Sequence, residues 1–382
     1  MQVLIVGAGF TGAVIARYLA EHDHHVIVID ERSHIAGNCF TKEDPKTGIM
    51  VHTYGPHIFH TDDEEVWDYV NRFGEMMPYR NQVKATVDGR VYSLPINLHT
   101  INQLYGKAMS PVEAQEFISK EARGDIADPI SFEDQALKFV GDKIYKAFFY
   151  GYTKKQWGRE PSELPASILK RLPLRFNYND NYFSHRFQGI PKDGYTKIVE
   201  GILDHRKIEL RLNTKSEELD QNFDHTIYTG PLDRWFDFRS GRLAYRTLRF
   251  EEFHETGDYQ GTAVMNYCDA EVPFTRITEH KHFAPWTSDQ FDKTVCYREF
   301  SGECGINDIP YYPVRLVGDK TMLEDYVQAA NQLEKVTFAG RLGTYSYLDM
   351  DVSIRRALET AESLQEQWQA GATGAVFSHS PI

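Results

Sequence analysis

The chain has 382 residues, 41% of them hydrophobic and 25% charged, which is ordinary for a globular enzyme with two or three lobes. Its formal net charge of -13 argues against nucleic acid or a membrane surface as the main partner, because either would favour a basic protein. The four cysteines show neither a C-x-x-C pair nor zinc-ligand spacing, and no apolar run approaches the roughly eighteen residues of a membrane span. With no leader pattern at the N-terminus, we expect reduced thiols and a cytoplasmic protein.

The N-terminal segment joins a short apolar run, Val3–Val6, to a G-x-G-x-x-G motif and then to a helical pattern. In such a motif the first glycine permits a tight turn, the second lets the backbone approach phosphates, and the third lets the helix pack on the strand. A second apolar run, Val26–Ile29, ends at an acid placed to accept from ribose hydroxyls. This segment therefore predicts a site for the ADP part of a dinucleotide, formed by Gly7, Gly9, Phe10, Thr11, Gly12 and Asp30.

Two further segments indicate which dinucleotide binds. The residues after the ribose acid resemble the extension found in flavoproteins of the amine-oxidase type, and they include Glu31, Arg32, Gly37 and Asn38. Near the other end, a predicted strand at Val336–Ala339 leads into Gly340 and Arg341, and a helical pattern follows. An ordinary strand, turn and helix would explain the late segment alone. Together the two segments favour FAD.

The middle of the chain contains helical and β signals. Ser110, Pro111 and Glu113 form a capping box, and Ser131 begins a second helical pattern that extends to Phe148. Two β-rich runs, 84–87 and 90–94, flank an Asp-Gly turn and predict a hairpin, and further β-rich runs lie between residues 243 and 276.

We therefore predict an α/β protein in which a Rossmann-type FAD-binding domain carries an inserted helical domain and an inserted mixed or antiparallel β-sheet domain. The FAD-binding domain is expected at residues 1–80, 196–235 and 314–382. The helical domain is expected at 98–175, with a mobile lid at about 164–180, and the sheet domain at 81–97, 181–195 and 236–313.

The predicted lid lies in a segment that is dense in aromatic residues, arginines and prolines. Pro165 and Pro173 bracket a short helical pattern, and a polar Asn/Asp run follows, which is typical of a loop that closes over a ligand. Arg171 would lie on this lid. A solvated connector whose arginine has no role is the alternative.

Several longer motifs have no generic explanation. They are Tyr54–Thr61, Gly151–Thr153, Gln156–Gly158, Leu164–Ala166, Arg276–Lys281, Tyr311–Pro313 and the segment from Gly340 to Asp351. In this order, along nearly the whole chain, they closely resemble the bacterial UDP-galactopyranose mutases. The resemblance implies an FAD-dependent isomerase that interconverts UDP-galactopyranose and UDP-galactofuranose. In this family N5 of the reduced flavin attacks the anomeric carbon without net redox change. The resemblance also implies a homodimer that supplies galactofuranose for cell-surface polysaccharide.

The resemblance further implies roles for individual residues. The catalytic group would be Arg171, Arg276, His57 and His60, with the arginines binding the diphosphate and the histidines beside the flavin. Residues expected to bind the substrate are Phe148, Tyr152, Thr153, Trp157, Arg171, Tyr182, Phe183, Asn266, Arg276, Tyr312, Tyr347 and Asp349, with Tyr311 as the alternative to Tyr312. Residues expected to bind FAD are Gly7, Gly9, Phe10, Thr11, Gly12, Asp30, Glu31, Arg32, Gly37, Asn38, His57, His60, Gly340, Arg341, Asp349 and Met350.

No metal site is expected, because His52, His57 and His60 have no nearby cysteine or spaced carboxylate to complete a ligand set. Three alternatives to the mutase function stay open. They are a UDP-N-acetylgalactosamine mutase of the same mechanism, a flavin oxidoreductase of the amine-oxidase type, and a nucleotide-sugar sensor without catalysis.

Overall fold

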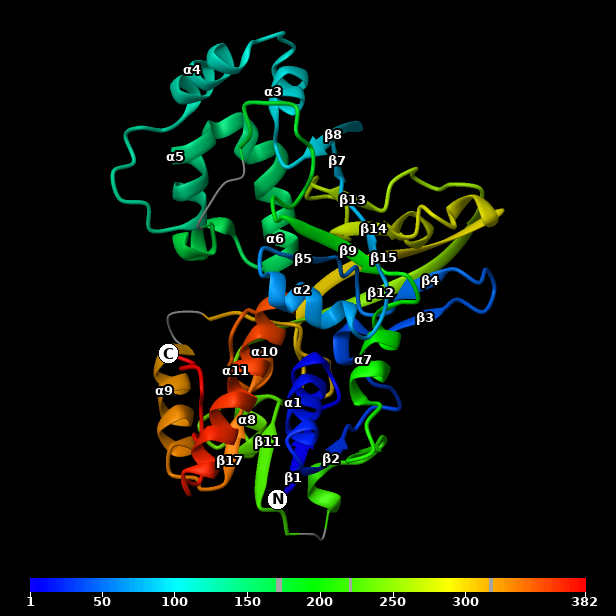
Figure 1. Ribbon diagram of the computed structural model, residues 1–382. Coiled ribbons are helices and arrows are strands. Elements are labelled where there is room, and N and C mark those ends of the chain that lie inside the picture. Colours follow the sequence, from blue (N-terminus) through cyan, green and yellow to red (C-terminus); the bar gives the residue numbers. More distant parts are fainter. Residues whose placement is uncertain (170–173, 220–221, 316–318) are drawn as a thin grey trace.

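The computed structural model describes residues 1–169, 174–219, 222–315 and 319–382. Strands from distant parts of this chain form a five-stranded parallel sheet in the lower half of Figure 1, in the order β10-β2-β1-β11-β17. These strands are β1 (Gln2–Val6), β2 (His25–Ile29), β10 (Ile208–Arg211), β11 (His225–Tyr228) and β17 (Val336–Phe338). The central strands are continuous apolar runs because helices cover both faces of the sheet.

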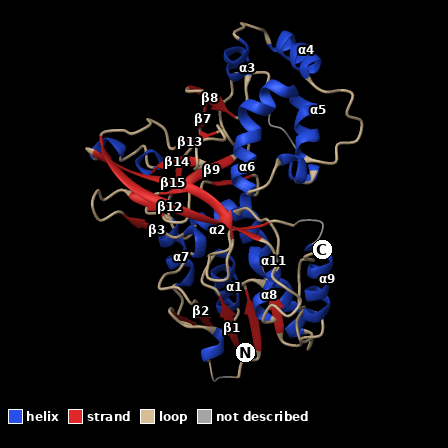
Figure 2. Ribbon diagram, turned by 180° about the vertical axis from the view of Figure 1, so that it is seen from behind, coloured by secondary structure: helices blue, strands red, loops and turns tan. Residues whose placement is uncertain are grey.

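Three helices pack together on one face of this sheet: α1 (Phe10–Glu21), α7 (Tyr195–Leu203) and α11 (Met350–Gln369). The buried face of α1 contains Ala13, Ala16 and Ala20, whose small side chains allow close packing. On the other face, α8 (Leu232–Trp235) and α9 (Asp319–Ala330) form a separate aromatic core with β11 and β17. Figure 2 shows this layered arrangement from behind.

A seven-stranded mixed sheet lies beside the first, in the order β16-β12-β15-β14-β13-β7-β8. Its strands are β16 (Tyr312–Pro313), β12 (Tyr245–Thr256), β15 (Lys293–Glu303), β14 (Arg276–Glu279), β13 (Val264–Tyr267), β7 (Val83–Val87) and β8 (Arg90–Leu94). The predicted β7–β8 hairpin is confirmed, with Asp88 and Gly89 at φ values of 48° and 69°.

The helical lobe at the top of Figure 1 contains α3 (Leu98–Tyr105), α4 (Pro111–Glu121), α5 (Phe132–Ile144), a π-helical turn (Tyr145–Tyr150) and α6 (Gly151–Trp157). The predicted capping box at Ser110 is present, and the helix predicted to begin at Ser131 also starts with a capping box. The helix predicted to continue to Phe148 is instead interrupted at Gly141, where φ is 71° and ψ is 177°. A Cβ atom there would lie 2.2 Å from the carbonyl oxygen of Glu121, so packing against the end of α4 imposes the break.

Two small sheets complete the fold. One pairs β3 (Thr41–Glu43) with β4 (Met50–His52), and the other has the order β5-β9-β6, with β5 (Phe59–Thr61), β9 (Phe187–Pro191) and β6 (Met76–Pro78). The remaining helices are α2 (Glu64–Asn71) and α10 (Gly340–Gly343). In the described ranges, none of the helices combines the length and apolar composition needed to cross a membrane. The predicted fold class is confirmed, whereas the domain limits and the lid stay predictions.

Candidate active site

The glycine motif forms a sharp turn between β1 and α1. Gly7 has a φ of 111°, and a Cβ atom at Gly12 would lie 1.9 Å from the carbonyl oxygen of Gly7. Any larger residue at position 12 would therefore push α1 away from β1. This is the packing that the sequence predicted for the third glycine of the motif.

Three segments converge at the start of α1. A Cβ atom at Gly37 would lie 3.4 Å from the Cα atom of Gly9, and one at Gly340 would lie 3.0 Å from Oγ1 of Thr11. In the described part of the chain no side chain caps α1, and the same holds for α7, α8, α10 and α11. Free amide groups at a helix N-terminus bind anions, so this cradle fits a dinucleotide diphosphate.

The acid at the end of β2 is held by the backbone. The carboxylate of Asp30 accepts from the amide N–H groups of Ala8 and Arg32, each at 2.9 Å. Glu31 instead forms a bidentate pair with Arg234 at 3.0 and 2.9 Å, and this hydrogen bonding lowers the pKa of Glu31. The Glu31 carboxylate therefore already has a partner, and the predicted FAD contact of that residue stays a prediction.

Arg276 lies at the start of β14 and is paired with a buried carboxylate. Its Nε and Nη2 atoms both lie 2.7 Å from Oε2 of Glu299, which is 1% exposed. Burial alone would lower the pKa of Arg276, but Glu299, with contributions from Tyr152 and Tyr312, raises it. The guanidinium is therefore a fixed positive charge.

Tyr152, Tyr182 and Tyr312 lie within electrostatic range of this arginine, and Tyr347 stacks on Tyr312. The rings of Tyr312 and Tyr347 stack at 5.8 Å, and the guanidinium of Arg341 lies 5.8 and 5.5 Å from their centroids. Tyr182 is 42% exposed and Tyr347 is 61% exposed, so both offer their rings to a ligand. Tyr311 is 3% exposed and its ring lies 6.5 Å from that of Tyr54. Tyr312 is thus the member of the double tyrosine that faces Arg276.

Two histidines lie within electrostatic range of these charged side chains, His57 near Arg276 and Arg341 and His60 near Asp349. Nδ1 of His57 lies 2.8 Å from the carbonyl oxygen of Gly55, so Nδ1 carries the proton and Nε2 is free to accept. Burial lowers the pKa of His57 to about 4, so the ring is neutral at pH 7. The ring of His60 stacks on Phe183 at 3.8 Å, and its buried Nδ1 has no hydrogen-bond partner among the described residues.

Arg341 at the start of α10 and Asp349 at the start of α11 form the next part of the candidate site. Arg341 donates to the carbonyl oxygens of Tyr311 and Leu348, at 3.2 and 2.5 Å. Asp349 occupies the N-cap position of α11 but, within the described chain, its side chain caps no amide. Its exposed carboxylate opposes the lowering of the His60 pKa by burial. Met350 follows as the first residue of α11.

The π-helical turn and α6 carry the candidate site residues that belong to the helical lobe. Phe148 and Thr153 are each 5% exposed, and Phe148 packs edge-to-face on Tyr92, so both residues belong largely to the core of the helical lobe. Tyr152 and Trp157 are half-buried at its edge. Asn266 on β13 pairs with Arg276 across the strands, and its Oδ1 is buried without a partner in the described ranges. An unsatisfied amide oxygen of this kind favours a ligand contact.

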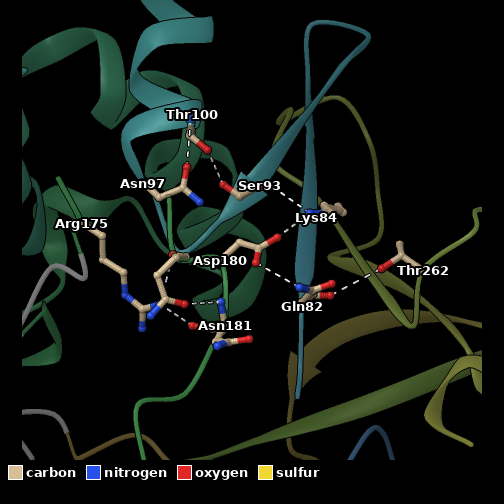
Figure 3. A network of polar contacts seen from close by, with 10 residues as sticks. Gln82, Lys84, Ser93, Asn97, Thr100, Arg175, Asp180, Asn181 and Thr262 are labelled. Carbon is tan, nitrogen blue, oxygen red and sulfur yellow. Dashed lines mark hydrogen bonds and ion pairs between the residues drawn. The ribbon is translucent and has the colours of Figure 1, made fainter. Parts of the chain in front are cut away.

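Arg171 lies outside the described residues. The segment that follows, shown in Figure 3, is anchored to β7. The carboxylate of Asp180 accepts from the side chains of Gln82 at 3.0 Å and Lys84 at 3.2 Å. Two residues further on, the amide of Tyr182 donates to the carbonyl oxygen of Asn81 at 2.7 Å. These bonds fix the chain just before Tyr182 and Phe183.

The sequence interpretation missed Glu299 and Tyr195. Glu299 lies opposite Arg276 only because β14 pairs with β15 in this register, and no local pattern indicates that pairing. Tyr195 is 1% exposed and packs edge-on against the rings of Phe10, His52 and His57. Tyr195 begins a helix with a strong apolar face, and this sequence pattern could have predicted that its ring is buried.

The fold and these residues define an enzyme with a Rossmann-like dinucleotide-binding domain and, beside it, a cluster of arginine and tyrosine side chains. The family described as UDP-galactopyranose mutase matches residues 147–347, and an NAD(P)-binding Rossmann-like domain matches residues 5–73.

Two curated relatives and one solved structure are similar along most of the chain. A probable UDP-galactopyranose mutase of Klebsiella pneumoniae is 58% identical over 362 residues, 94% of each chain. A dTDP-fucopyranose mutase of Escherichia coli is 54% identical, over 94% of this chain and 97% of that one. A crystal structure of reduced UDP-galactopyranose mutase shares the fold, with a TM-score of 0.75 and 15% identity over 97% of this chain and 96% of that one. The chain belongs to the UDP-galactopyranose mutase family. It is therefore a sugar-nucleotide mutase.

Proposed function

We propose that this enzyme interconverts UDP-galactopyranose and UDP-galactofuranose and that FAD, in its reduced form, is its cofactor. The observation that carries the proposal is the charge of Arg276, held by buried Glu299 and ringed by tyrosines next to the dinucleotide cradle. We further propose a cytoplasmic homodimer that supplies galactofuranose for cell-surface polysaccharide.

In this proposal Arg276 and the hydroxyl groups of Tyr182, Tyr312 and Tyr347 bind the diphosphate of the substrate. A guanidinium that is already paired and oriented stabilises the charge that develops on the departing diphosphate without reorganising. Arg171, the second arginine that the family resemblance implies, would add a second positive charge. Asn266 would accept a hydrogen bond from the nucleotide or sugar through its free Oδ1.

The glycine cradle, Asp30 and Arg341 would hold FAD. Reduced flavin supplies a nucleophilic nitrogen at the anomeric carbon, so no side-chain nucleophile is required. The free Nε2 of neutral His57 would accept a hydrogen bond from the cofactor or substrate. The stacked aromatic rings of Tyr312, Tyr347 and Phe183 would exclude water from the reacting carbon.

A dTDP-fucopyranose substrate is the second candidate, because the Escherichia coli relative with that activity is 54% identical. The test offers the reduced enzyme the furanose forms of UDP-galactose, UDP-N-acetylgalactosamine and dTDP-fucose, and compares kcat/KM by chromatography. The proposal predicts the highest value for UDP-galactofuranose. A clear preference for the dTDP sugar would overturn the substrate assignment, and no turnover of any of the three would overturn the function.

A further inference from the structure

One lysine joins the helical lobe to the strand hairpin that carries Arg276. Lys155 lies near the end of α6, which Figure 1 shows against the seven-stranded sheet. Its ammonium donates to the carbonyl oxygens of Tyr267, Asp269 and Phe274, at 2.7, 2.8 and 3.1 Å. The first of these carbonyls belongs to the last residue of β13, and the other two belong to the connection between β13 and β14. Since a lysine has three N–H donors, all of them are used on this one turn.

The backbone of α6 also approaches this turn directly. Gly151 lies one helical turn before Lys155, on the same face of the helix. A Cβ atom at Gly151 would lie 2.2 Å from the carbonyl oxygen of Cys268 and 2.8 Å from the amide nitrogen of Ala270. On its other side, the carbonyl oxygen of Gln156 accepts from Nε of Arg246 at 2.9 Å and from the Ser301 hydroxyl at 2.7 Å. The end of α6 is therefore clamped onto the sheet.

The two elements joined in this way both carry residues of the proposed substrate site. Helix α6 carries Tyr152 and Trp157, and the hairpin carries Asn266 and Arg276 at the two ends of the turn. Tyr152 also contributes to the raised pKa of Arg276, so the two side chains lie within electrostatic range. A displacement of the turn would change their separation.

We propose that Lys155 is a positioning residue that sets the distance between α6 and the strand bearing Arg276, and thereby the fit of the nucleotide diphosphate. This inference rests on the proposed function, because it takes Tyr152 and Arg276 as ligands of the UDP-sugar. Three carbonyl groups, at the end of β13 and in the connection to β14, fix the position of the ammonium relative to the hairpin.

The protonation state of Lys155 should change the affinity for the substrate. Burial lowers the pKa of Lys155 to about 8, while the facing groups Cys268, Asp269 and Glu271 act to raise it. On α6 itself, Lys154 pairs with exposed Glu160. Above this pH a neutral amine has only two N–H donors for three carbonyls, so substrate affinity should fall.

The test compares Lys155→Met, Lys155→Arg and the neighbouring control Lys154→Met in the FAD-loaded full-length enzyme. Measured for each are the Kd for UDP, KM and kcat with UDP-galactofuranose, flavin content, and the pH dependence of KM between pH 7 and about 9.5. We expect Lys155→Met to raise Kd and KM about tenfold, with kcat and flavin content nearly unchanged. Lys154→Met should match the wild type. Lys155→Arg should retain most of the affinity and lose the rise in KM above pH 8, because arginine stays charged.

A Lys155→Met enzyme with the wild-type Kd and KM would overturn the inference. If that variant does not fold, Lys155→Arg decides: a KM that rises with pH as in the wild type contradicts the role of Lys155. Failure of the proposed function has a different outcome, in which the wild type itself neither binds UDP nor converts UDP-galactofuranose.

Discussion

At the scale of single residues, the site depends on a charge that is expensive to bury. Arg276 keeps its charge because Glu299 lies directly against it, and the pair is stable only while both members are present. Exposed tyrosines then complete a surface that attracts an anion.

Replacing Arg276 with alanine should lower kcat/KM by about 100-fold or more, because the departing diphosphate loses its preorganised positive charge. Flavin content should stay near that of the wild type. Steady-state kinetics and the absorbance of bound flavin measure both quantities. Arg249→Ala is the matched control, since Arg249 lies in the same sheet but is exposed and pairs with Glu251. Wild-type turnover in Arg276→Ala would contradict the assignment.

The Glu299→Gln variant tests whether Arg276 needs the negative charge of Glu299 or only its hydrogen-bond acceptor. The buried guanidinium loses its counter-charge but keeps a hydrogen-bond acceptor, and breaking a buried pair of this kind typically costs about 3–5 kcal/mol. We expect a lower midpoint of thermal unfolding and a higher KM, measured by calorimetry and kinetics. An enzyme as stable as the wild type would show that Glu299 does not stabilise the charge of Arg276.

At the scale of elements, local signals were reliable and contacts between distant segments were not predictable. The capping box at Ser110, the helix start at Ser131 and the Asp-Gly hairpin were predicted because their hydrogen bonds join neighbouring residues. The break at Gly141 was missed because α4 causes it from another part of the chain. The Arg276–Glu299 pair likewise depends on the register of β14 and β15.

The glycine motif offers a test at this scale. Gly12→Ala places a methyl group 1.9 Å from the carbonyl oxygen of Gly7, so α1 must move away from β1 and the cradle must open. We expect the purified variant to contain little or no flavin. Gly124→Ala is the control, because a Cβ atom there meets no described atom within 4 Å. A fully flavinated Gly12→Ala protein would show that the cradle does not hold the cofactor.

At the scale of the whole molecule, strands from both ends of the chain and from residues 208–228 build one sheet, and the other segments bring the proposed substrate residues to the proposed cofactor cradle. Arg341 links the parts, because it follows the glycine that contacts Thr11 and lies against Tyr312 and Tyr347. The family motifs identified most of these residues from the sequence, but only the fold explains why residues more than 300 positions apart in the chain, such as Thr11 and Gly340, meet.

Buried neutral histidines give the whole molecule a defined response to acid. Burial lowers the pKa of His57 and of His225 to about 4 and that of His280 to about 3. The unfolded chain binds protons at these groups below its ordinary pKa of about 6.5, so stability is full above that pH and falls as the pH drops toward 4. Each histidine should contribute about 1.4 kcal/mol per pH unit in this window, measured by urea unfolding. A free energy of unfolding that does not change between pH 6.5 and 5 would contradict this.

The central claim is that a reduced flavin catalyses the interconversion of the pyranose and furanose rings without net redox change. The most direct measurement follows conversion of UDP-galactofuranose to UDP-galactopyranose under anaerobic conditions, with the flavin either oxidised or fully reduced at the start. We predict many turnovers per flavin with the reduced enzyme, none with the oxidised enzyme, and a flavin that is still reduced at the end. Equal turnover in both states, or oxidation of one flavin for each sugar converted, would contradict the account.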